Sequence, residues 1–413
     1  MKNLGLRNSP AFGSQVRYVL LGAPPCGKSG GSATLLELGQ ALDSRGIPAV
    51  LLADHGRLSY RLEGGARCRT ALPVLPEHLI LPEGHPRRRE PPRRPRKRAR
   101  QRLRLFLDMI ESRMRWRRPT PEAAAVFIGD DHEAGGPRLA RAAKILNHAG
   151  SPDAFMDWWA RGELKSVDRE AAYRDHLSRF DAVLFQAAAH ADEAERLGAV
   201  DRERALVLRP SCDERRLTAA QRAPSPFADD VCAVVYVGSL QPRKDQESAV
   251  RGFAKAAETR DDLQLYLVGG AGRGRKPYAE HLSAVAAELG VAHRVHLVGH
   301  RHDHERYLAH ACIVLQTSRS EGVARSLREA AFLGKAIVAT RLSGTVELLR
   351  EDGGRLVEVG DTEAIGAAIN LVAGQDELRR ALGERVRAHY ACAWSTTRYA
   401  DTAARLFEPL LRD

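Results

Sequence analysis

Two carboxylates in the second half of the chain, Glu321 and Glu329, lie eight positions apart around a predicted helix start. The run RSEGVARSLREAAFLGKAIVAT follows the apolar run CIVLQTS, so Glu321 falls just before the helix and Glu329 falls inside it. Gly322 lets a ligand approach the backbone closely, and the first helical turn, Val323–Ser326, offers free amide groups. The carboxylates can accept hydrogen bonds from hydroxyls, and the amides can bind phosphate. This pattern suits a ligand with hydroxyls at both ends and phosphates in the middle, which is the shape of a nucleotide sugar.

A second anion-binding element is predicted in the turn SLQPRKDQ, which connects the strand VVYVG to the helix ESAVRGFAKAAE. Gly238 and Ser239 begin this turn. The free N–H groups and the dipole of a helix N-terminus both favour phosphate. Lys244, with Arg243 as a second candidate, would add positive charge beside that helix.

Short apolar runs alternate with helical segments in both halves of the chain. The first series lies at residues 17–22, 47–54, 123–131, 140–148, 180–186 and 205–211, and the second at 231–238, 263–270, 294–299, 312–318, 335–340 and 355–360. Such runs, separated by helices, predict parallel sheets with crossover helices. The fold class expected is α/β, with two Rossmann-like, doubly wound domains that face a cleft. Ligands of such sheets bind beyond the carboxyl ends of the strands.

The length of 413 residues exceeds the size at which one core stops growing, so two domains are expected. We assign residues 1–217 to an N-terminal domain with a basic insertion at 86–118, and residues 231–392 to a C-terminal domain. Residues 218–230 contain two prolines and no helical periodicity, which indicates a linker. A C-terminal helix at 393–413 is expected to pack back toward the N-terminal domain.

The net charge of +12 resides in one segment. Residues 87–118 contain 15 Lys and Arg and three acidic residues, so the rest of the chain is neutral. The Pro- and Arg-rich start of this segment indicates a solvated loop, and the apolar residues from Leu103 to Met114 fall on one face of a helix. That helix either docks on its own domain or lies on an anionic membrane surface. Binding of nucleic acid is disfavoured, because the charge forms a single insertion and does not line a face.

The cysteines are scattered and form no C-x-x-C pair, which indicates reduced thiols instead of a disulfide framework or a zinc site. The tract HRHDHERYLAH at 300–310 is interpreted as a solvated loop and not as a metal site. No run of 18 apolar residues occurs, and the first residues lack the apolar stretch of a secretory signal. We therefore expect a cytoplasmic protein. If the basic segment meets lipid, we expect the protein to bind peripherally at the inner face of the membrane.

The chain resembles the family-4 retaining glycosyltransferases, which have the GT-B fold. The resemblance covers nearly the whole sequence and is strongest from about Val231 to Asp376. It rests on VGSLQPRKD, LYLVGG, VHLVGH, the Glu321–Glu329 run, GKAIVAT and TVELLREDGGRLVEVGDTEAIGAAI. It implies a hexosyltransferase that moves a sugar from a nucleotide sugar to an acceptor hydroxyl with retention of configuration, in glycan, glycolipid or glycosylated-metabolite biosynthesis.

The resemblance also implies roles for individual residues of the C-terminal domain. Glu321 would contact the donor sugar, Glu329 the ribose, and Lys244 the phosphates. In the N-terminal, acceptor-side domain it implies that Gly30 and Gly31 form a glycine-rich loop facing the phosphates. It further implies that His148, at the end of a strand, lies beside the reacting sugar. His148, Glu321 and Lys244 are thus the predicted catalytic residues.

The sequence departs from the family pattern in two places. Ser239 follows Gly238 where the family has arginine, so a second phosphate cation would have to come from Arg243 or another residue. Val323 and Ala324 stand where the family has an aromatic residue and glycine, so packing against the sugar would differ. All five of these positions are predicted to line the donor site.

Two alternatives remain open from the sequence alone. GAPPCGKS at 22–29 satisfies the P-loop pattern after a strand, which predicts an NTPase or kinase with Lys28 on the phosphates and Ser29 on Mg²⁺. The other alternative is an inactive module that binds a nucleotide or a glycan.

The resemblance predicts no metal and no cofactor. A donor linked to UDP or GDP is expected, with a glycan, a lipid-linked molecule or a small molecule as acceptor. Nucleic acid is not expected as a partner.

Overall fold

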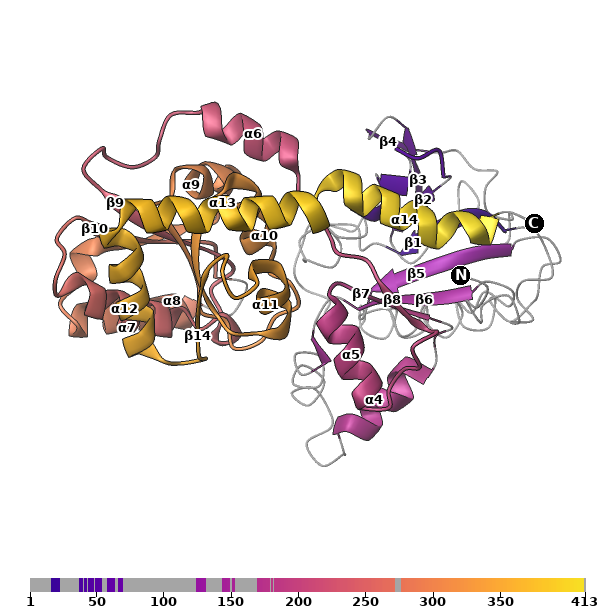
Figure 1. The fold of residues 1–413 in the computed structure, drawn as a ribbon, viewed down its shortest axis with the longest axis horizontal. Coiled ribbons are helices and arrows are strands. Elements are labelled where there is room, and N and C mark those ends of the chain that lie inside the picture. The colour runs from indigo at the N-terminus through magenta and orange to yellow at the C-terminus, as the bar shows by residue number, and fades with distance from the viewer. Residues whose placement is uncertain are drawn as a thin grey trace, which may run out of the picture.

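The computed structural model describes part of the first half of the chain and nearly all of the second half. The described residues are 16–22, 37–39, 41–42, 44–47, 49–53, 58–63, 66–69, 124–130, 143–148, 151–152, 169–178, 180, 182–271 and 276–411. Two sheets lie side by side, one in each half of the chain (Figure 1). The predicted loop residues Gly30 and Gly31, the P-loop residues Lys28 and Ser29, and the basic insertion lie outside the described residues.

The first sheet has eight strands in the order β4-β3-β2-β1-β5-β6-β7-β8. Their bounds are β1 Val16–Gly22, β2 Ala49–Ala53, β3 Leu58–Glu63, β4 Ala66–Arg69, β5 Ala124–Asp130, β6 Ala143–His148, β7 Ala182–Phe185 and β8 Ala205–Val207. From β2 through β1 to β8 every pairing is parallel, as predicted. The edge formed by β3 and β4 is antiparallel, which the sequence analysis did not predict. These two strands mix polar and apolar residues, so no apolar run marked them.

The second sheet has six parallel strands in the order β11-β10-β9-β12-β13-β14. Their bounds are β9 Cys232–Val237, β10 Leu263–Val268, β11 Val295–Gly299, β12 Ile313–Gln316, β13 Ala336–Thr340 and β14 Arg355–Val357. All six predicted runs are confirmed as strands. The four inner strands are largely buried because helices cover both faces, which is why their runs are mostly apolar. The edge strands β11 and β14 are only partly buried.

Helices form a layer on each face of the second sheet. Helices α7 Gln246–Ala257, α8 Lys276–Glu288 and α12 Thr362–Gly374 share one core with the strands. Helices α6 Glu214–Arg222, α9 His304–His310, α10 Arg325–Leu333 and α11 Ser343–Leu349 share the other core, together with α13 Asp376–Ala393. Successive strand residues alternate between the two cores, as the period of a strand requires. The predicted α/β fold with doubly wound sheets is therefore confirmed.

The connection between the sheets contains a helix. In the first half, α4 Arg169–Ser178 and α5 Ala188–Arg196 precede and follow β7, and α6 comes after β8. Residues 218–222 of the predicted linker lie in α6, because Asp213 accepts from the backbone N–H of Arg216 at 3.1 Å and starts the helix. Leu217 and Ala220 of α6 are buried against the second sheet.

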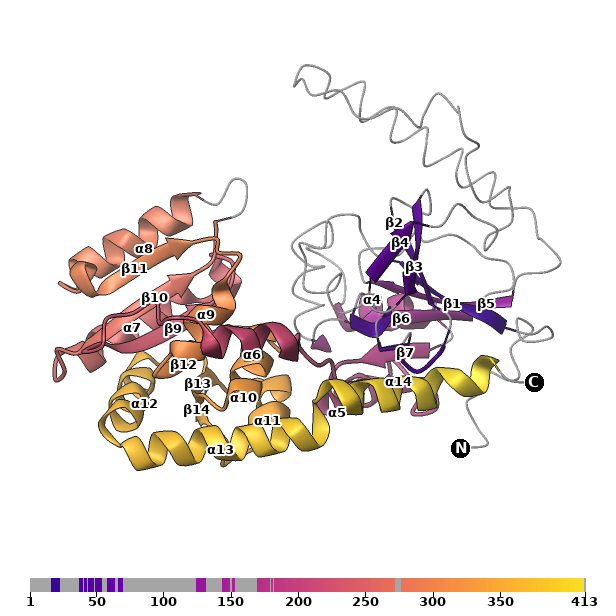
Figure 2. The same cartoon turned by 90° about the horizontal axis from the view of Figure 1, so that it is seen from above.

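The chain returns to the first sheet at its end. Helix α13 lies on the second half, and α14 Thr396–Leu411 continues along the first half against β1 (Figures 1 and 2). Asp401 of α14 forms an ion pair with Arg45, and Tyr399, Ala403 and Phe407 are buried. Among the described residues, no helix is both long enough and apolar enough to span a bilayer.

Candidate functional site

Two loops meet at the carboxyl edge of the second sheet. One follows β9 and contains the short 3-10 turn Pro242–Lys244, and the other follows β12 and runs from residue 317 to 324. Strands β9 and β12 are neighbours in the middle of the sheet, although β10 and β11 separate them in the chain. Their connections leave in opposite directions, which opens a crevice at this switch point. The predicted donor-site residues Gly238 to Lys244 and Glu321 to Ala324 belong to these two loops.

Glu321 lies at the centre of a buried cluster of charges. Its carboxylate forms an ion pair with Nζ of Lys244, and its Oε2 lies 3.4 Å from Nη1 of Arg243. Oγ of Ser318 donates to Oε1 of Glu321 at 3.1 Å. The Glu321 and Lys244 side chains are only 10% and 14% exposed. The structure thus brings together two of the three predicted catalytic residues, Glu321 and Lys244, and adds the candidate cation Arg243.

The cluster keeps Glu321 ionised. Burial alone would raise the pKa of this carboxyl, but Lys244, Arg243 and the Ser318 hydroxyl together hold its pKa below the usual value. The charged form is stabilised because a low-dielectric site strengthens attraction between opposite charges. Glu321 is therefore an acceptor of hydrogen bonds and not an acid at neutral pH.

Neutral side chains fix both loops in place. The Tyr236 hydroxyl donates to the backbone carbonyl of Lys244 at 2.5 Å and lies 3.3 Å from Oγ of Ser318. Thr317 donates to the carbonyl of Asp245 at 2.7 Å, and Thr340 of β13 donates to the carbonyl of Ser318 at 2.7 Å. These hydroxyls satisfy buried carbonyls, which would otherwise be costly to desolvate. Sequence reasoning missed them, although a tyrosine within the buried run VVYVG indicates a hydroxyl that needs a partner.

Asp245 begins α7 in the left-handed conformation, with φ of 49°. Its carboxylate accepts from the N–H and the hydroxyl of Ser248, so the helix N-terminus is already capped. Arg319 reaches the same carboxylate at 3.1 Å from the other loop. This loop could therefore attract an anion through the positive charges of Lys244 and Arg243. It could not do so through a free N-terminus of α7.

Two glycine contacts hold the loops close to their neighbours. A Cβ on Gly269 would lie 1.8 Å from the carbonyl oxygen of Gly238, and a Cβ on Gly344 would lie 2.2 Å from that of Gly322. Only glycine tolerates such approaches. Ser239, next to Gly238, is exposed, and its hydroxyl accepts from Gln241 at 3.0 Å.

Val323 and Ala324 point into the protein. They are only 5% and 6% exposed and belong to the core formed with α6, α9, α10 and α13. This burial explains why small apolar residues are accepted there. Helix α10 begins at Arg325, directly after Ala324, so that Glu321 precedes the helix and Glu329 lies inside it, as predicted.

Glu329 has its own pair of cations. Its carboxylate accepts from Nε of Arg325 at 2.9 Å and lies 3.3 Å from Nε2 of His304, and its side chain is 2% exposed. Burial would raise the pKa of Glu329, but His304 and Arg325 hold its pKa below the usual value. Burial would lower the pKa of His304, but attraction to Glu329, together with that to Glu305, raises it above the usual value. His304 begins α9 and is not in a solvated loop as predicted, because this ion pair draws it inward.

Among the other histidines of that tract, His300 and His302 lie in the loop before α9 as predicted, whereas His310 ends α9 with its Nε2 2.8 Å from the carbonyl oxygen of Ala223. His300 and His302 are exposed, and their rings lie 4.9 Å apart. Within the part of the chain that the structure describes, no group of three or more His, Cys, Asp or Glu side chains is arranged to hold a metal ion.

Two residues of the first half, Glu37 and His190, contact the second half beside this site. His148 is the last residue of β6, at the carboxyl edge of the first sheet, as predicted. Glu37 is buried and lies 3.7 Å from Arg328 of α10. His190 of α5 is fully buried, and its Cε1 lies 3.0 Å from the Cβ position of Gly344. Glu37 and His190 were missed, because no local pattern distinguishes a residue that is buried only by the other half.

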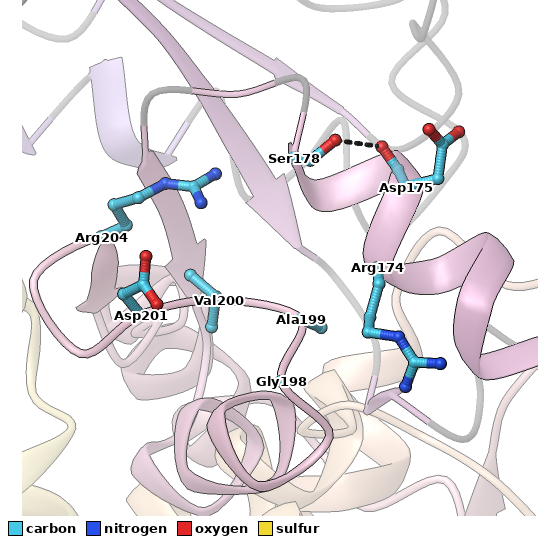
Figure 3. Close-up of a pocket in the computed structure, with 8 residues that line it drawn as sticks. All are labelled: Arg174, Asp175, Ser178, Gly198, Ala199, Val200, Asp201 and Arg204. Atoms are coloured by element: carbon cyan, nitrogen blue, oxygen red, sulfur yellow. Dashed lines mark hydrogen bonds between the residues drawn. The ribbon is translucent and has the colours of Figure 1, made fainter.

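The pocket in Figure 3 belongs to a different place. It has a volume of about 350 Å³ and lies between α4 and the segments that lead from α5 into β8. These segments enter the strands at their amino ends, away from the edge that carries His148. Its two arginines, Arg174 and Arg204, donate to backbone carbonyls, including that of Leu197 at 3.2 Å and that of Leu177 at 2.9 Å. These two arginines therefore hold loops in place.

Comparison with solved structures identifies the fold class. The crystal structure of Anabaena HepE in complex with UDP and glucose matches with a TM-score of 0.67 at 15% identity, over 95% of this chain and 99% of that one. At this identity the likeness shows the fold alone. That fold is GT-B, the arrangement of two Rossmann-like domains found in many glycosyltransferases.

The family model matches the second half of the chain. Residues 218–389 match the family model described as glycosyl transferases group 1, and this range contains the second sheet and both loops of the site. The lipopolysaccharide core biosynthesis glycosyltransferase LpsE of Rhizobium meliloti (strain 1021) is 26% identical over 65% of this chain and 80% of that protein. The D-inositol 3-phosphate glycosyltransferase of Acidothermus cellulolyticus (strain ATCC 43068 / DSM 8971 / 11B) is 32% identical over 39% of this chain and 38% of that protein. These matches support a glycosyltransferase and do not favour the P-loop alternative.

Proposed function

We propose that this protein is a retaining glycosyltransferase of family 4, which transfers a hexose-type sugar from a nucleotide sugar to an acceptor hydroxyl. The observation that carries the proposal is the buried carboxylate of Glu321, held by Lys244 and Arg243 at the switch point of the second sheet. This cluster lies within the range that matches the glycosyl transferases group 1 model. A fixed carboxylate suits sugar hydroxyls, and the two cations suit the diphosphate of the donor.

In the proposed reaction, the bond between the anomeric carbon and the leaving phosphate breaks through an oxocarbenium-like transition state. Negative charge then grows on the phosphate oxygen, where Lys244, Arg243 and the amides at the start of α10 stabilise it. When the donor binds, the ammonium group of Lys244 would contact the phosphate as well as the carboxylate of Glu321. Arg243 supplies the cation that Ser239 does not.

Retention would follow from attack on the same face as the leaving group. Glu321 would orient the donor sugar, and His148 at the end of β6 would contact it from the N-terminal domain, together with Gly30 and Gly31. We assign the acceptor to the N-terminal domain, residues 1–217, and the donor to the C-terminal domain, residues 231–392. Closure of the two domains would then exclude water from the reacting sugar.

We propose UDP or GDP as the donor nucleotide, and no metal ion or cofactor. The relative HepE was crystallised with UDP and glucose, which supports this class of donor. The ribose is assigned to Glu329, whose carboxylate oxygens keep acceptor capacity beyond Arg325 and His304.

The test is a screen of nucleotide sugars by thermal shift, followed by an assay for sugar transfer. A ligand at a hundred times its Kd stabilises the folded state by about 2.7 kcal/mol, so the correct donor should raise Tm clearly. Retention is read from the anomeric configuration of the product by NMR. Flat curves with UDP-, GDP- and ADP-sugars would leave the inactive binding module as the better explanation. ATP hydrolysis that is lost in Lys28→Ala would favour the NTPase.

We further propose that the basic segment 87–118 contacts an anionic membrane surface and brings the enzyme to a glycan or lipid-linked acceptor. Its excess of 12 positive charges supports this role, since each basic residue near such a surface contributes about 1 kcal/mol. Substituting the basic residues of 87–104 with Ser and Gln should abolish salt-sensitive binding to vesicles that contain phosphatidylserine. Transfer to a soluble acceptor should persist. Failure of the wild-type protein to bind such vesicles at low salt would contradict this role.

A further inference from the structure

Two cysteines lie side by side at the amino edge of the second sheet. Sγ of Cys232 is 2.8 Å from Sγ of Cys312, although the two residues are 80 positions apart in the chain. Both are free thiols. A disulfide joins sulfurs about 2.0 Å apart, so bond formation requires a sulfur movement of less than about 1 Å.

The backbone holds these side chains in this position. Cys232 is the first residue of β9, and Cys312 directly precedes β12, the parallel neighbour of β9. The N–H of Cys312 donates to the carbonyl of Ala233 at 2.9 Å, which extends the ladder to this point. Both cysteines pack on the core that contains α7, α8 and α12, so they lie on the same face of the sheet.

The two thiols differ in access and in charge. Cys232 is buried, whereas Cys312 is partly exposed. The hydrogen bond from Cys232, together with the nearby cations Arg379 and Lys335, lowers the pKa of Cys312 to about 7. Burial and the shared hydrogen bond raise the pKa of Cys232. Since the thiolate is the nucleophile in thiol chemistry, Cys312 is the sulfur that reacts first.

We propose that Cys232 and Cys312 form a reversible dithiol–disulfide site that reacts with low-molecular-weight disulfides of the glutathione type. The Cys312 thiolate attacks one sulfur of the small disulfide, forms a mixed disulfide and releases one small thiolate. Cys232 then loses its proton to water and attacks Sγ of Cys312, which releases the second small thiolate. Two protein thiols are oxidised to one disulfide, and one small disulfide is reduced to two thiols.

The disulfide would join the starts of the two central strands of the sheet. It would close a loop of 80 residues, and a constraint on so long a loop lowers the entropy of the unfolded chain. The donor loops leave the same two strands at their other ends, so the site is separate from the proposed donor site. The inference does not depend on the proposed function.

The experiment treats the full chain with oxidised glutathione and follows intact mass, disulfide-linked peptides and Tm, with no donor present. We expect the wild-type protein to lose the mass of two hydrogen atoms, to yield a peptide pair that links Cys232 to Cys312, and to melt about 5 °C or more higher. Dithiothreitol should reverse all three changes. Cys392→Ser, which removes an exposed thiol, should respond as the wild type does.

The single variants test the order of attack. Cys232→Ser should stop at a glutathione adduct on Cys312, and Cys312→Ser should remain unmodified at Cys232. Should Cys232→Ser fold poorly, Cys232→Ala serves the same purpose. Wild-type protein that accumulates only the mixed disulfide, links other cysteines instead, or keeps its Tm after oxidation would overturn the proposal.

Discussion

The two ends of strands β9 and β12 carry different chemistry. At the carboxyl end, the loops hold the charge cluster of Glu321, Lys244 and Arg243. At the amino end, the same strands hold the thiols of Cys232 and Cys312 in direct contact. The strands are neighbours along their length, but their outgoing connections diverge at the carboxyl end only.

This difference supports placing the proposed ligand at the carboxyl end of the two strands. Divergent loops leave buried charges whose partners can be exchanged for those of a ligand. At the amino end the two side chains fill the space between the strands, so that they can react only with each other or with a small reagent. Changes at the carboxyl end should therefore alter activity, whereas changes at the amino end should alter stability.

The largest effect is expected for Glu321→Gln, which keeps the shape of the side chain and removes its charge. Turnover should fall roughly 10²–10³-fold, because the loss concerns a preorganised contact of the transition state. The free energy of unfolding should change by about 1–3 kcal/mol at most. Steady-state kinetics and urea unfolding measure the two quantities, and Cys312→Ser is the matched control at the opposite end. Near-normal turnover of Glu321→Gln would contradict the proposal that the donor binds at this edge of the sheet.

Lys244→Met should lower turnover about 10²-fold, since Arg243 remains near the phosphate site. It should also destabilise the protein, because it leaves the buried Glu321 carboxylate with one cation fewer. Combining Lys244→Met with Glu321→Gln should restore much of the stability without restoring activity. A double variant as unstable as Lys244→Met alone would show that the ion pair is not the cause.

A smaller effect is expected for Glu329→Ala. A ribose contact is formed equally in the ground state and in the transition state, so this variant should raise the KM for the donor about tenfold and leave kcat nearly unchanged. The comparison variant is Arg325→Ala, which removes a partner of Glu329 and leaves its carboxylate in place. A fall in kcat with unchanged KM would assign Glu329 a different role.

The smallest effect concerns pH and His304. Its folded pKa is raised above the ordinary value of 6.5, so the protonated side chain stabilises the fold below that pH. The contribution should be lost as pH rises through the raised pKa. The stability difference between wild type and His304→Ala should therefore shrink between pH 6 and pH 9, by about 1 kcal/mol or less. His302→Ala, at an exposed position of the same tract, should show no such trend.

Much of the second sheet could be predicted from the sequence. Its inner strands are largely buried on both faces, so that each appears as a mostly apolar run, whereas the edge strands β11 and β14 are only partly buried. The hairpin of β3 and β4 was not predicted, because LSYRLE and ARCR contain charged residues within the strands. The two glycines between them, Gly64 and Gly65, were the available signal for a tight turn.

The site was predictable where its residues lie within one loop. Glu321, Gly322 and Lys244 were found from their place after a strand. Partners from other elements were not, since Tyr236 reaches the carbonyl of Lys244, and His304 reaches Glu329, only through folding. His304 meets Glu329 from 25 positions away, and Cys232 meets Cys312 from 80. Contacts over such distances leave no periodic trace in a single sequence.

The return of α14 to β1 has a consequence for how the protein is made on the ribosome. A nascent chain emerges from its N-terminus, and domains generally fold as they emerge. Here β1 emerges before the whole second sheet, and α14, which contacts β1 and pairs Asp401 with Arg45, emerges after it. The second sheet can fold during synthesis, because its strands and crossover helices follow one another directly. The contact between α14 and β1 can therefore form only after the second sheet has been synthesised.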